Sequence, residues 1–212
     1  MAARDFKPIS LLAKVPSLYV MHPDVRAKNL KEFVALAGSK PGQLNDGSAG
    51  NDSAGHLTFK YLKIATGIFI LHASYRGTDP PLTDLLVGRL QAAAVGAPAI
   101  LQFVKAGKLR CIATSSVQRI AALPEMTQWY GLPAPAPAPA PATLPAAAAA
   151  AAAADKLAVA AARAVREPTA LERLSGDAAL AVGSTPAEVT AFIAKERERR
   201  KLVIARAKVK PD

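Results

Sequence analysis

The sequence predicts an α/β protein built on a doubly wound sheet. Between residues 17 and 116, short apolar runs alternate with segments of helical period, which is typical of βαβ units on a parallel sheet. Of the 212 residues, 51% are hydrophobic and 20% are charged, as in folded globular proteins rather than disordered or fibrous ones. This length allows either one large core or two modest domains.

Five strands are expected in this first half of the chain. The continuous apolar run IFILHAS at 68–74 predicts a buried strand. The segment QLNDGSAG at 43–50 leads into a helix and supplies several glycines. The other strand candidates are SLYVMH at 17–22, LQAAAVG at 90–96 and LRCIATSS at 109–116.

Four helices are expected between these strands. The first covers residues 29–40, with Asn29 as its N-cap, and places its apolar residues on one face. The second is expected over 53–65, and the third, over 81–90, starts with the proline that a first helical turn accepts. The fourth covers 97–107. The apolar face of the first helix consists of Leu30, Phe33, Val34 and Ala37.

The chain changes character after residue 123. Residues 133–142 alternate proline and alanine, and residues 146–154 are all alanine. A helix without any difference between apolar and polar positions has no face to bury. Our hypothesis is that some of these letters stand for side chains that were never identified. Mass spectrometry of peptides across 131–156 tests it, and genuine repeats would contradict it.

Helices are expected again in the last third of the chain. One covers 155–168 and ends at its proline, and a short segment with two leucines follows. A capped helix then begins at Ser184 or Thr185, with Pro186 in its first position and Glu188 in its first turn. Its residues expected to face inward are Val189, Phe192, Ile193, Leu202 and Val203.

The stretch GSAGNDSAG at 47–55 is the main candidate site. Ligands of open α/β sheets sit at the carboxyl ends of strands, where free N–H groups at a helix start attract anions. Its glycines permit a close approach, Ser48 and Ser53 offer hydroxyls, and Asn51 offers an amide. A phosphate loop is excluded, because no lysine follows before Lys60. Two interpretations stay open: a carboxylate-binding loop, and a structural turn with a serine-capped helix.

A second loop, SYRGTDPPLTDLL, follows the next strand at the same edge of the sheet. Thr78 can cap its helix or donate a hydrogen bond to a ligand, and Gly77 permits a tight approach. Arg76 fits a surface position or a ligand contact.

The residue inventory argues against metal, cofactor and catalysis. A single cysteine, Cys111, excludes an internal disulfide framework, and it lies in a predicted buried strand. With only three histidines no metal site is expected, and no cofactor motif is present. His56 follows the candidate loop without an evident carboxylate to orient it, so we expect a protein that is not an enzyme.

The strong positive charge supports an alternative function. The net charge is +11, and residues 195–210 contain eight basic and two acidic residues. Such a segment can bind nucleic acid through phosphates without sequence preference. The bland interpretation of this segment is a solvated face of a terminal helix. A shallow dependence of duplex binding on salt concentration would dismiss nucleic-acid binding.

Several motifs together resemble the tripartite tricarboxylate transporter substrate-binding proteins, the Bug or TctC family. The long block DFKPIS to NDSAGHLT is similar to the family's central block, and HASYRGTDPPLTDLLVGRLQ is similar to its PY-K/R-G-x-x-P-x-L-x-D-L-x-x-G motif. AGKLRCIATSSVQRIAALPE and VGSTPAEVTAFIAKE continue the resemblance.

The resemblance implies a periplasmic-binding-protein-like fold of two doubly wound lobes, with the first lobe incomplete in this chain. Residues 1–17 would be a crossing segment, and 18–123 the second lobe with the ligand loop. Residues 124–154 would be a crossing segment that holds the doubtful alanine stretch, and 155–212 would be helices of the first lobe. No export signal and no apolar run of membrane-spanning length are found in the sequence.

The resemblance also implies a function. A monomeric periplasmic protein would capture a mono-, di- or tricarboxylate without transforming it and deliver it to the membrane subunits of a transporter. No nucleic acid partner is expected in this interpretation. The residues implied to hold the ligand are Ser48, Ala49, Gly50, Asn51 and Ser53, with Thr78 in the second loop.

Overall fold

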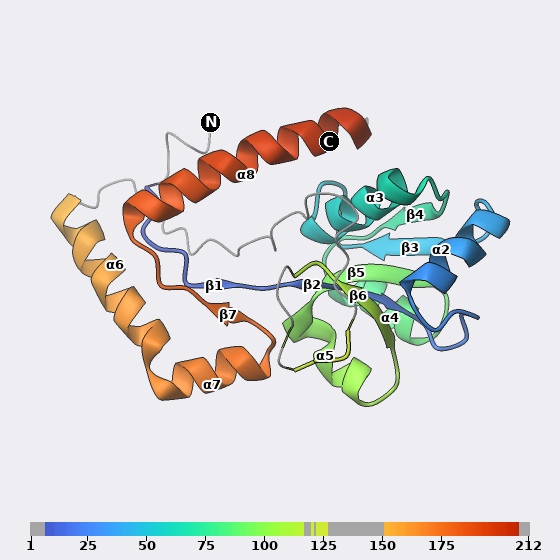
Figure 1. The fold of residues 1–212 in the computed structure, drawn as a ribbon, viewed down its shortest axis with the longest axis horizontal. Helices are drawn as coiled ribbons and strands as arrows, with labels where there is room; N and C mark the ends of the chain where they lie inside the picture. The colour runs from blue at the N-terminus through green and yellow to red at the C-terminus, as the bar shows by residue number, and fades with distance from the viewer. Residues whose placement is uncertain (1–6, 117–119, 121, 127–150, 208–212) are drawn as a thin grey trace.

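The computed structural model describes residues 7–116, 120, 122–126 and 151–207, and it consists of a sheet body and a helical arm (Figure 1). The strands are β1 Ala13–Lys14, β2 Ser17–Met21, β3 Asn45–Ser48, β4 Leu71–Ser74, β5 Ala92–Gly96, β6 Arg110–Thr114 and β7 Leu180–Ala181. The helices are α2 Leu30–Ser39, α3 Ala54–Thr66, α4 Asp79–Leu86, α5 Ala97–Lys105, α6 Ala151–Arg166, α7 Pro168–Gly176 and α8 Pro186–Ala207.

The body contains a five-stranded sheet in the order β4-β3-β5-β2-β6. Strand β3 is parallel to β4 and β5, whereas β2 is antiparallel to both of its neighbours. The expectation of an all-parallel sheet is therefore wrong for β2. The chain enters β2 directly from the arm, without the crossover that a parallel strand requires. As a result Ser17, the first residue of β2, pairs with Gly96, the last residue of β5.

Strand β4 corrects a second expectation. It lies at the edge of the sheet and begins only at Leu71. In the run that predicted a buried strand, Ile68 and Ile70 are buried, but Phe69 and Leu71 are 60% and 48% exposed. At the edge of the sheet the strand has a neighbour on one side only, β3, so part of this run stays exposed.

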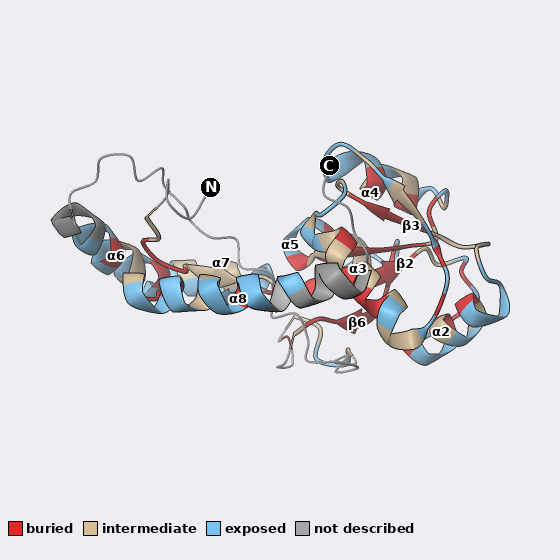
Figure 2. Ribbon diagram, turned by 90° about the horizontal axis from the view of Figure 1, so that it is seen from above, coloured by how far each residue is buried: buried red, intermediate tan, exposed pale blue. Residues whose placement is uncertain are grey.

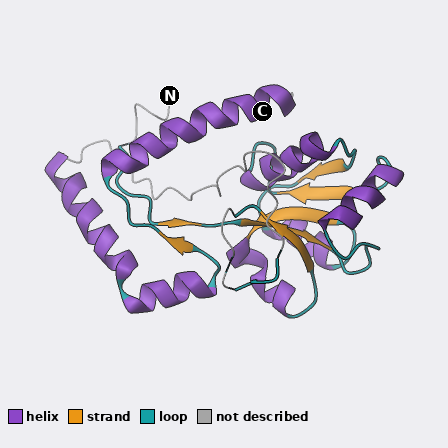
Figure 3. Ribbon diagram, in the orientation of Figure 1, coloured by secondary structure: helices purple, strands orange, loops and turns teal. Residues whose placement is uncertain are grey.

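Helices cover both faces of the sheet, as a doubly wound fold requires (Figure 3). Successive residues of β2 point to opposite faces, so Tyr19 packs into the core under α2 and α3, and Leu18 into the core under α4 and α5. Phe33 and Phe59 meet edge to face in the first core, with ring centroids 6.4 Å apart. Most residues of β2, β3 and β6 are buried (Figure 2).

The helix starts follow the predicted capping residues. Asn29 accepts a hydrogen bond from the Glu32 N–H at 2.9 Å. Thr185, rather than Ser184, caps α8: its Oγ1 accepts from the Glu188 N–H, and Glu188 accepts from the Thr185 N–H at 2.8 Å. This reciprocal pair is a capping box. Ser184 is buried and accepts instead from the Leu11 N–H at 2.9 Å.

The arm is an open frame of α6, α7 and α8, joined to the body by the β1–β7 pair, and α8 returns to contact α3 (Figure 1). Of the residues expected to face inward, Val189 is buried, Phe192 and Ile193 are half-buried, and the side chains at 202 and 203 lie outside the description. Apolar side chains also stay exposed on the arm: Leu157, Val159, Leu171 and Leu180.

The basic stretch of α8 is interrupted by acids. Lys195 and Arg197 are exposed, Glu196 between them is buried, and Lys201 pairs with Glu198 at 2.7 Å. Nucleic-acid binding by this helix stays a prediction. Among the described helices, none combines the length and apolar character needed to cross a membrane.

The proline-alanine repeat lies outside the described residues. So does most of the alanine run, although α6 begins at Ala151, earlier than the expected start at residue 155. The helix then ends at Arg166, just before Pro168 opens α7.

Candidate functional site

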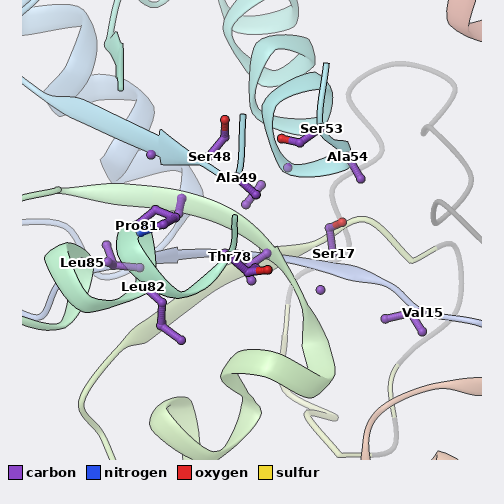
Figure 4. Close-up of a pocket in the computed structure, with 16 residues that line it drawn as sticks. Val15, Ser17, Ser48, Ala49, Ser53, Ala54, Thr78, Pro81, Leu82 and Leu85 are labelled. Carbon is purple, nitrogen blue, oxygen red and sulfur yellow. The ribbon is translucent and has the colours of Figure 1, made fainter. Parts of the chain in front are cut away.

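A cavity of about 370 Å³ opens at the carboxyl ends of β3 and β5 (Figure 4). The starts of α3 and α4 border it, and so does the start of β2. No charged side chain is found among its lining residues in the described part of the chain. They are Val15, Ser17, Gly47, Ser48, Ala49, Ser53, Ala54, Gly55, Thr78, Pro81, Leu82, Leu85, Ala93, Ala94, Val95 and Gly96.

Four of the six residues named from the sequence line this cavity: Ser48, Ala49, Ser53 and Thr78. Gly50 and Asn51 belong to the same loop but are not part of the lining. Gly50 has a φ of +134°, which a residue with a Cβ rarely adopts, so the loop requires glycine there. Ligand contact by any of the six remains a proposal.

Ser48 ends β3 with its hydroxyl turned into the protein. Its Oγ lies 2.8 Å from His72 Nε2 and donates to the Gly50 carbonyl oxygen at 2.9 Å. Figure 4 shows the oxygen of Ser48 pointing away from Thr78 and Ser17. Ser48 therefore presents its backbone, rather than its hydroxyl, to the cavity.

The start of α3 is capped by Ser53. Its Oγ accepts from the His56 N–H at 3.3 Å, so the hydroxyl hydrogen stays available for another acceptor. Asp52 is exposed and does not line the cavity, so its carboxylate does not oppose an anion there from within the lining. Gly55 brings the helix onto β5, because a Cβ at Gly55 would collide with the carbonyl oxygen of Ala94.

The start of α4 contributes Thr78. It precedes the first helical residue, but its side chain makes no capping hydrogen bond. Capping, one of its two predicted roles, is therefore not what the hydroxyl does here. Arg76 is exposed and does not line the cavity, as a surface arginine would be.

Sequence reasoning missed the contribution of β2. Val15 and Ser17 line the cavity because β2 runs antiparallel, which places its start beside the end of β5. No local signal identifies them, since the direction of a strand depends on its partners. Leu82 and Leu85 of α4 form the apolar side of the cavity, and the sequence predicted only that they lie in a helix.

A buried ion pair supports α3 beneath the loop. Lys63 forms an ion pair with Asp46 of β3 and donates to the Ile70 carbonyl oxygen at 2.8 Å. Burial raises the pKa of Asp46 to about 6 against the opposing attraction of Lys63, and burial also lowers the pKa of Lys63. The pair ties α3 to β3 and to the residue before β4.

The described residues contain no group of three or more metal-ligating side chains. Cys111 is buried in β6, and burial raises the pKa of its thiol to about 12. A thiol held protonated in this way is a poor nucleophile.

Comparison with known proteins places this geometry in a family. A family model described as tripartite tricarboxylate transporter family receptor matches residues 1–209. Protein BugT of Bordetella pertussis is 27% identical over 212 residues, which cover 92% of this chain and 60% of BugT. The chain spans about 60% of the length of the curated relatives it matches.

Solved structures agree in fold. The structure of R. palustris Rpa4515 with adipate has a TM-score of 0.88 at 23% identity, and the match covers 98% of this chain and 70% of that one. MatC (Rpa3494) from Rhodopseudomonas palustris with bound malate has a TM-score of 0.80 at 20% identity, covering 94% and 69%. These matches confirm the periplasmic-binding-protein-like fold, and their coverage agrees with an incomplete first lobe. The chain belongs to the family of tripartite tricarboxylate transporter receptors.

Proposed function

We propose that this chain is a solute-binding receptor that holds a small organic acid by its carboxylate. The carboxylate would accept hydrogen bonds from backbone N–H groups of the loop Ser48 to Asn51, directly or through water, and from the hydroxyls of Ser53 and Thr78. The observation that carries the proposal is the meeting of two helix starts, those of α3 and α4, on one cavity without charged lining residues. Backbone N–H groups at helix starts favour anions without a cationic side chain.

The chemistry of the ligand follows from the two sides of the cavity. Opposite the loop, the lining is aliphatic and includes Leu82, Leu85 and Val95. A short aliphatic chain behind the carboxylate would bury its methylene groups there, each worth about 0.8 kcal/mol. Adipate and malate, which the two similar structures contain, are small carboxylates with a short carbon chain.

The wider role is also a proposal. The receptor would act in the periplasm as a monomer, catalyse nothing, and deliver its ligand to the membrane subunits of a transporter. The helices from residue 155 onward would belong to the first lobe, with residues 18–123 as the second lobe and the segments 1–17 and 124–154 crossing between them. The exposed apolar side chains Leu157 and Val159 on α6 support this assignment, because they offer a surface to pack against.

The test is a titration followed by amide NMR shifts, which registers even millimolar affinities. Adipate and malate are compared with 1,6-hexanediol, which lacks the carboxylates. We expect shifts at residues 48–53 and 78 with the acids and none with the diol. The double variant Ser53→Ala, Thr78→Val should weaken acid binding by about a hundredfold or more, from two lost hydrogen bonds to a charged group.

The matched control is Thr190→Val, which removes a hydroxyl from the exposed side of α8. It should bind like the parent chain. Equal binding by the double variant and this control would move the site away from the loop. Shifts of the same size with 1,6-hexanediol as with the acids would refute carboxylate binding.

A further inference from the structure

Two histidines from consecutive elements, α3 and β4, meet behind the ligand loop. His56 on α3 and His72 on β4 stack with ring centroids 4.1 Å apart and ring planes inclined by 11°. His56 is buried and His72 is half-buried. Neither ring lines the cavity, so direct ligand contact does not explain the pair.

His72 holds the start of the loop. Its Nε2 is 2.8 Å from Ser48 Oγ, which itself donates to the Gly50 carbonyl oxygen at 2.9 Å. A hydroxyl has a single hydrogen, so with that hydrogen on Gly50 the contact requires Nε2–H of His72 to donate. The Gly50 N–H completes the turn by donating to Ser48 Oγ at 3.3 Å.

His56 holds the end of the same loop, and it uses Nδ1 where His72 uses Nε2. The Asp52 N–H donates to His56 Nδ1 at 3.1 Å, so Nδ1 is an acceptor without a proton. Asp52 has a φ of 62°, a left-handed conformation that residues with a Cβ rarely adopt. The bond to His56 therefore holds a backbone conformation that the loop does not favour by itself.

The contact of His56 needs a neutral ring, because a protonated ring has no nitrogen left to accept, whereas the contact of His72 needs only the Nε2–H. The surroundings favour neutral rings at both positions. Burial is the main cause that lowers the pKa of both histidines, to about 4 for His72. The charge of His56 lowers the pKa of His72, Lys60 and Lys63 of α3 lower the pKa of both histidines, and Asp52 raises that of His56.

We propose that the stacked pair His56 and His72 is a positioning device for the ligand loop. One ring fixes Ser48 and the other fixes Asp52, so that the backbone between them keeps the form in which Ala49 lines the cavity. The expected effect of the pair on ligand affinity rests on the proposed carboxylate site. Its expected effect on the backbone of the loop does not.

The test uses two amides at each position, which differ from each other by one methylene. A glutamine amide reaches about as far as Nε2, and an asparagine amide about as far as Nδ1. His72→Gln should therefore keep the contact with Ser48, and His72→Asn should lose it. At the other position the order reverses: His56→Asn keeps an acceptor for the Asp52 N–H, and His56→Gln misplaces it.

Amide hydrogen exchange at Gly50 and Asp52 and the affinity for adipate are the two readouts. The contact-losing variants, His72→Asn and His56→Gln, should exchange at one of these amides about tenfold faster and bind adipate about tenfold more weakly, as expected for one lost hydrogen bond. The contact-keeping variants should stay within about threefold of the parent chain. His22→Asn, just beyond the opposite end of β2, is the control and should change neither readout.

The reversed order of the two amides separates positioning from simple packing, which would rank them alike at both positions. The same ranking at both positions, or unchanged exchange in all four variants, would overturn the proposal. If the parent chain binds no carboxylate while exchange follows the reversed order, the proposed function fails and the positioning role stands.

Discussion

The close contact between α3 and β5 predicts that Gly55→Ala destabilises the protein. The added Cβ would lie closer than 3.0 Å to the Ala94 carbonyl oxygen, a separation that Cβ atoms essentially never show. Since the atom it meets is backbone, the start of α3 or strand β5 has to move, and such overpacking costs about 1–3 kcal/mol. The same movement displaces Ser53 and Ala54 from the cavity wall.

Gly38→Ala is the matched control, because it makes the same substitution in α2. A Cβ at Gly38 meets nothing within 4 Å, and the residue is exposed. Alanine is better than glycine inside a helix by about 0.8–1 kcal/mol, so this variant should be more stable than the parent chain.

Urea unfolding followed by circular dichroism measures both variants. With a slope of about 2 kcal/mol per molar, Gly55→Ala should lower the midpoint by about 0.5–1.5 M and Gly38→Ala should raise it by about 0.4 M. If both alanines stabilise to the same degree, α3 is free to shift on the sheet, and the close packing of α3 against β5 is not what holds the site.

Three further predictions concern buried or half-buried groups. Lys63→Met should cost about 3–5 kcal/mol in urea unfolding, because it leaves the buried Asp46 carboxylate unpaired, and adding Asp46→Asn should recover most of that loss. For His72, burial lowers the pKa of the folded state to about 4, so the stability that its neutral ring contributes should be present above about pH 6.5 and be lost as the pH falls toward about 4. The urea midpoint of His72→Gln should fall less over that range than that of the parent chain. Cys111, buried and with its thiol pKa raised to about 12, should react with a thiol reagent at mildly alkaline pH only when urea unfolds the protein.

Each of these has a result that contradicts it. A double variant at 46 and 63 no more stable than Lys63→Met would show that the pair is not coupled. If the urea midpoints of His72→Gln and of the parent chain fall equally between about pH 6.5 and 4, another group causes the loss of stability in acid. Rapid thiol labelling under native conditions would place Cys111 at an accessible position.

Local patterns were sufficient for most elements of the sheet body and for the place of the candidate loop. The hydrogen bonds of a helix and of its cap join residues a few positions apart, so Asn29 and Glu188 identify helix starts without knowledge of the fold. The glycine-rich stretch at 47–55 likewise predicts a loop between a strand and a helix, and in the structure β3 ends at Ser48 and α3 begins at Ala54.

Only the tertiary structure decided what the residues of that loop face. The sequence suggested Ser48 as a hydroxyl donor, but its Oγ contacts His72, whose position depends on the pairing of β3 with β4. Ser17 reaches the cavity because β2 is antiparallel to β5. Strand order and direction are set by hydrogen bonds between segments far apart in the chain, and a local pattern carries no information about which partner a strand will have.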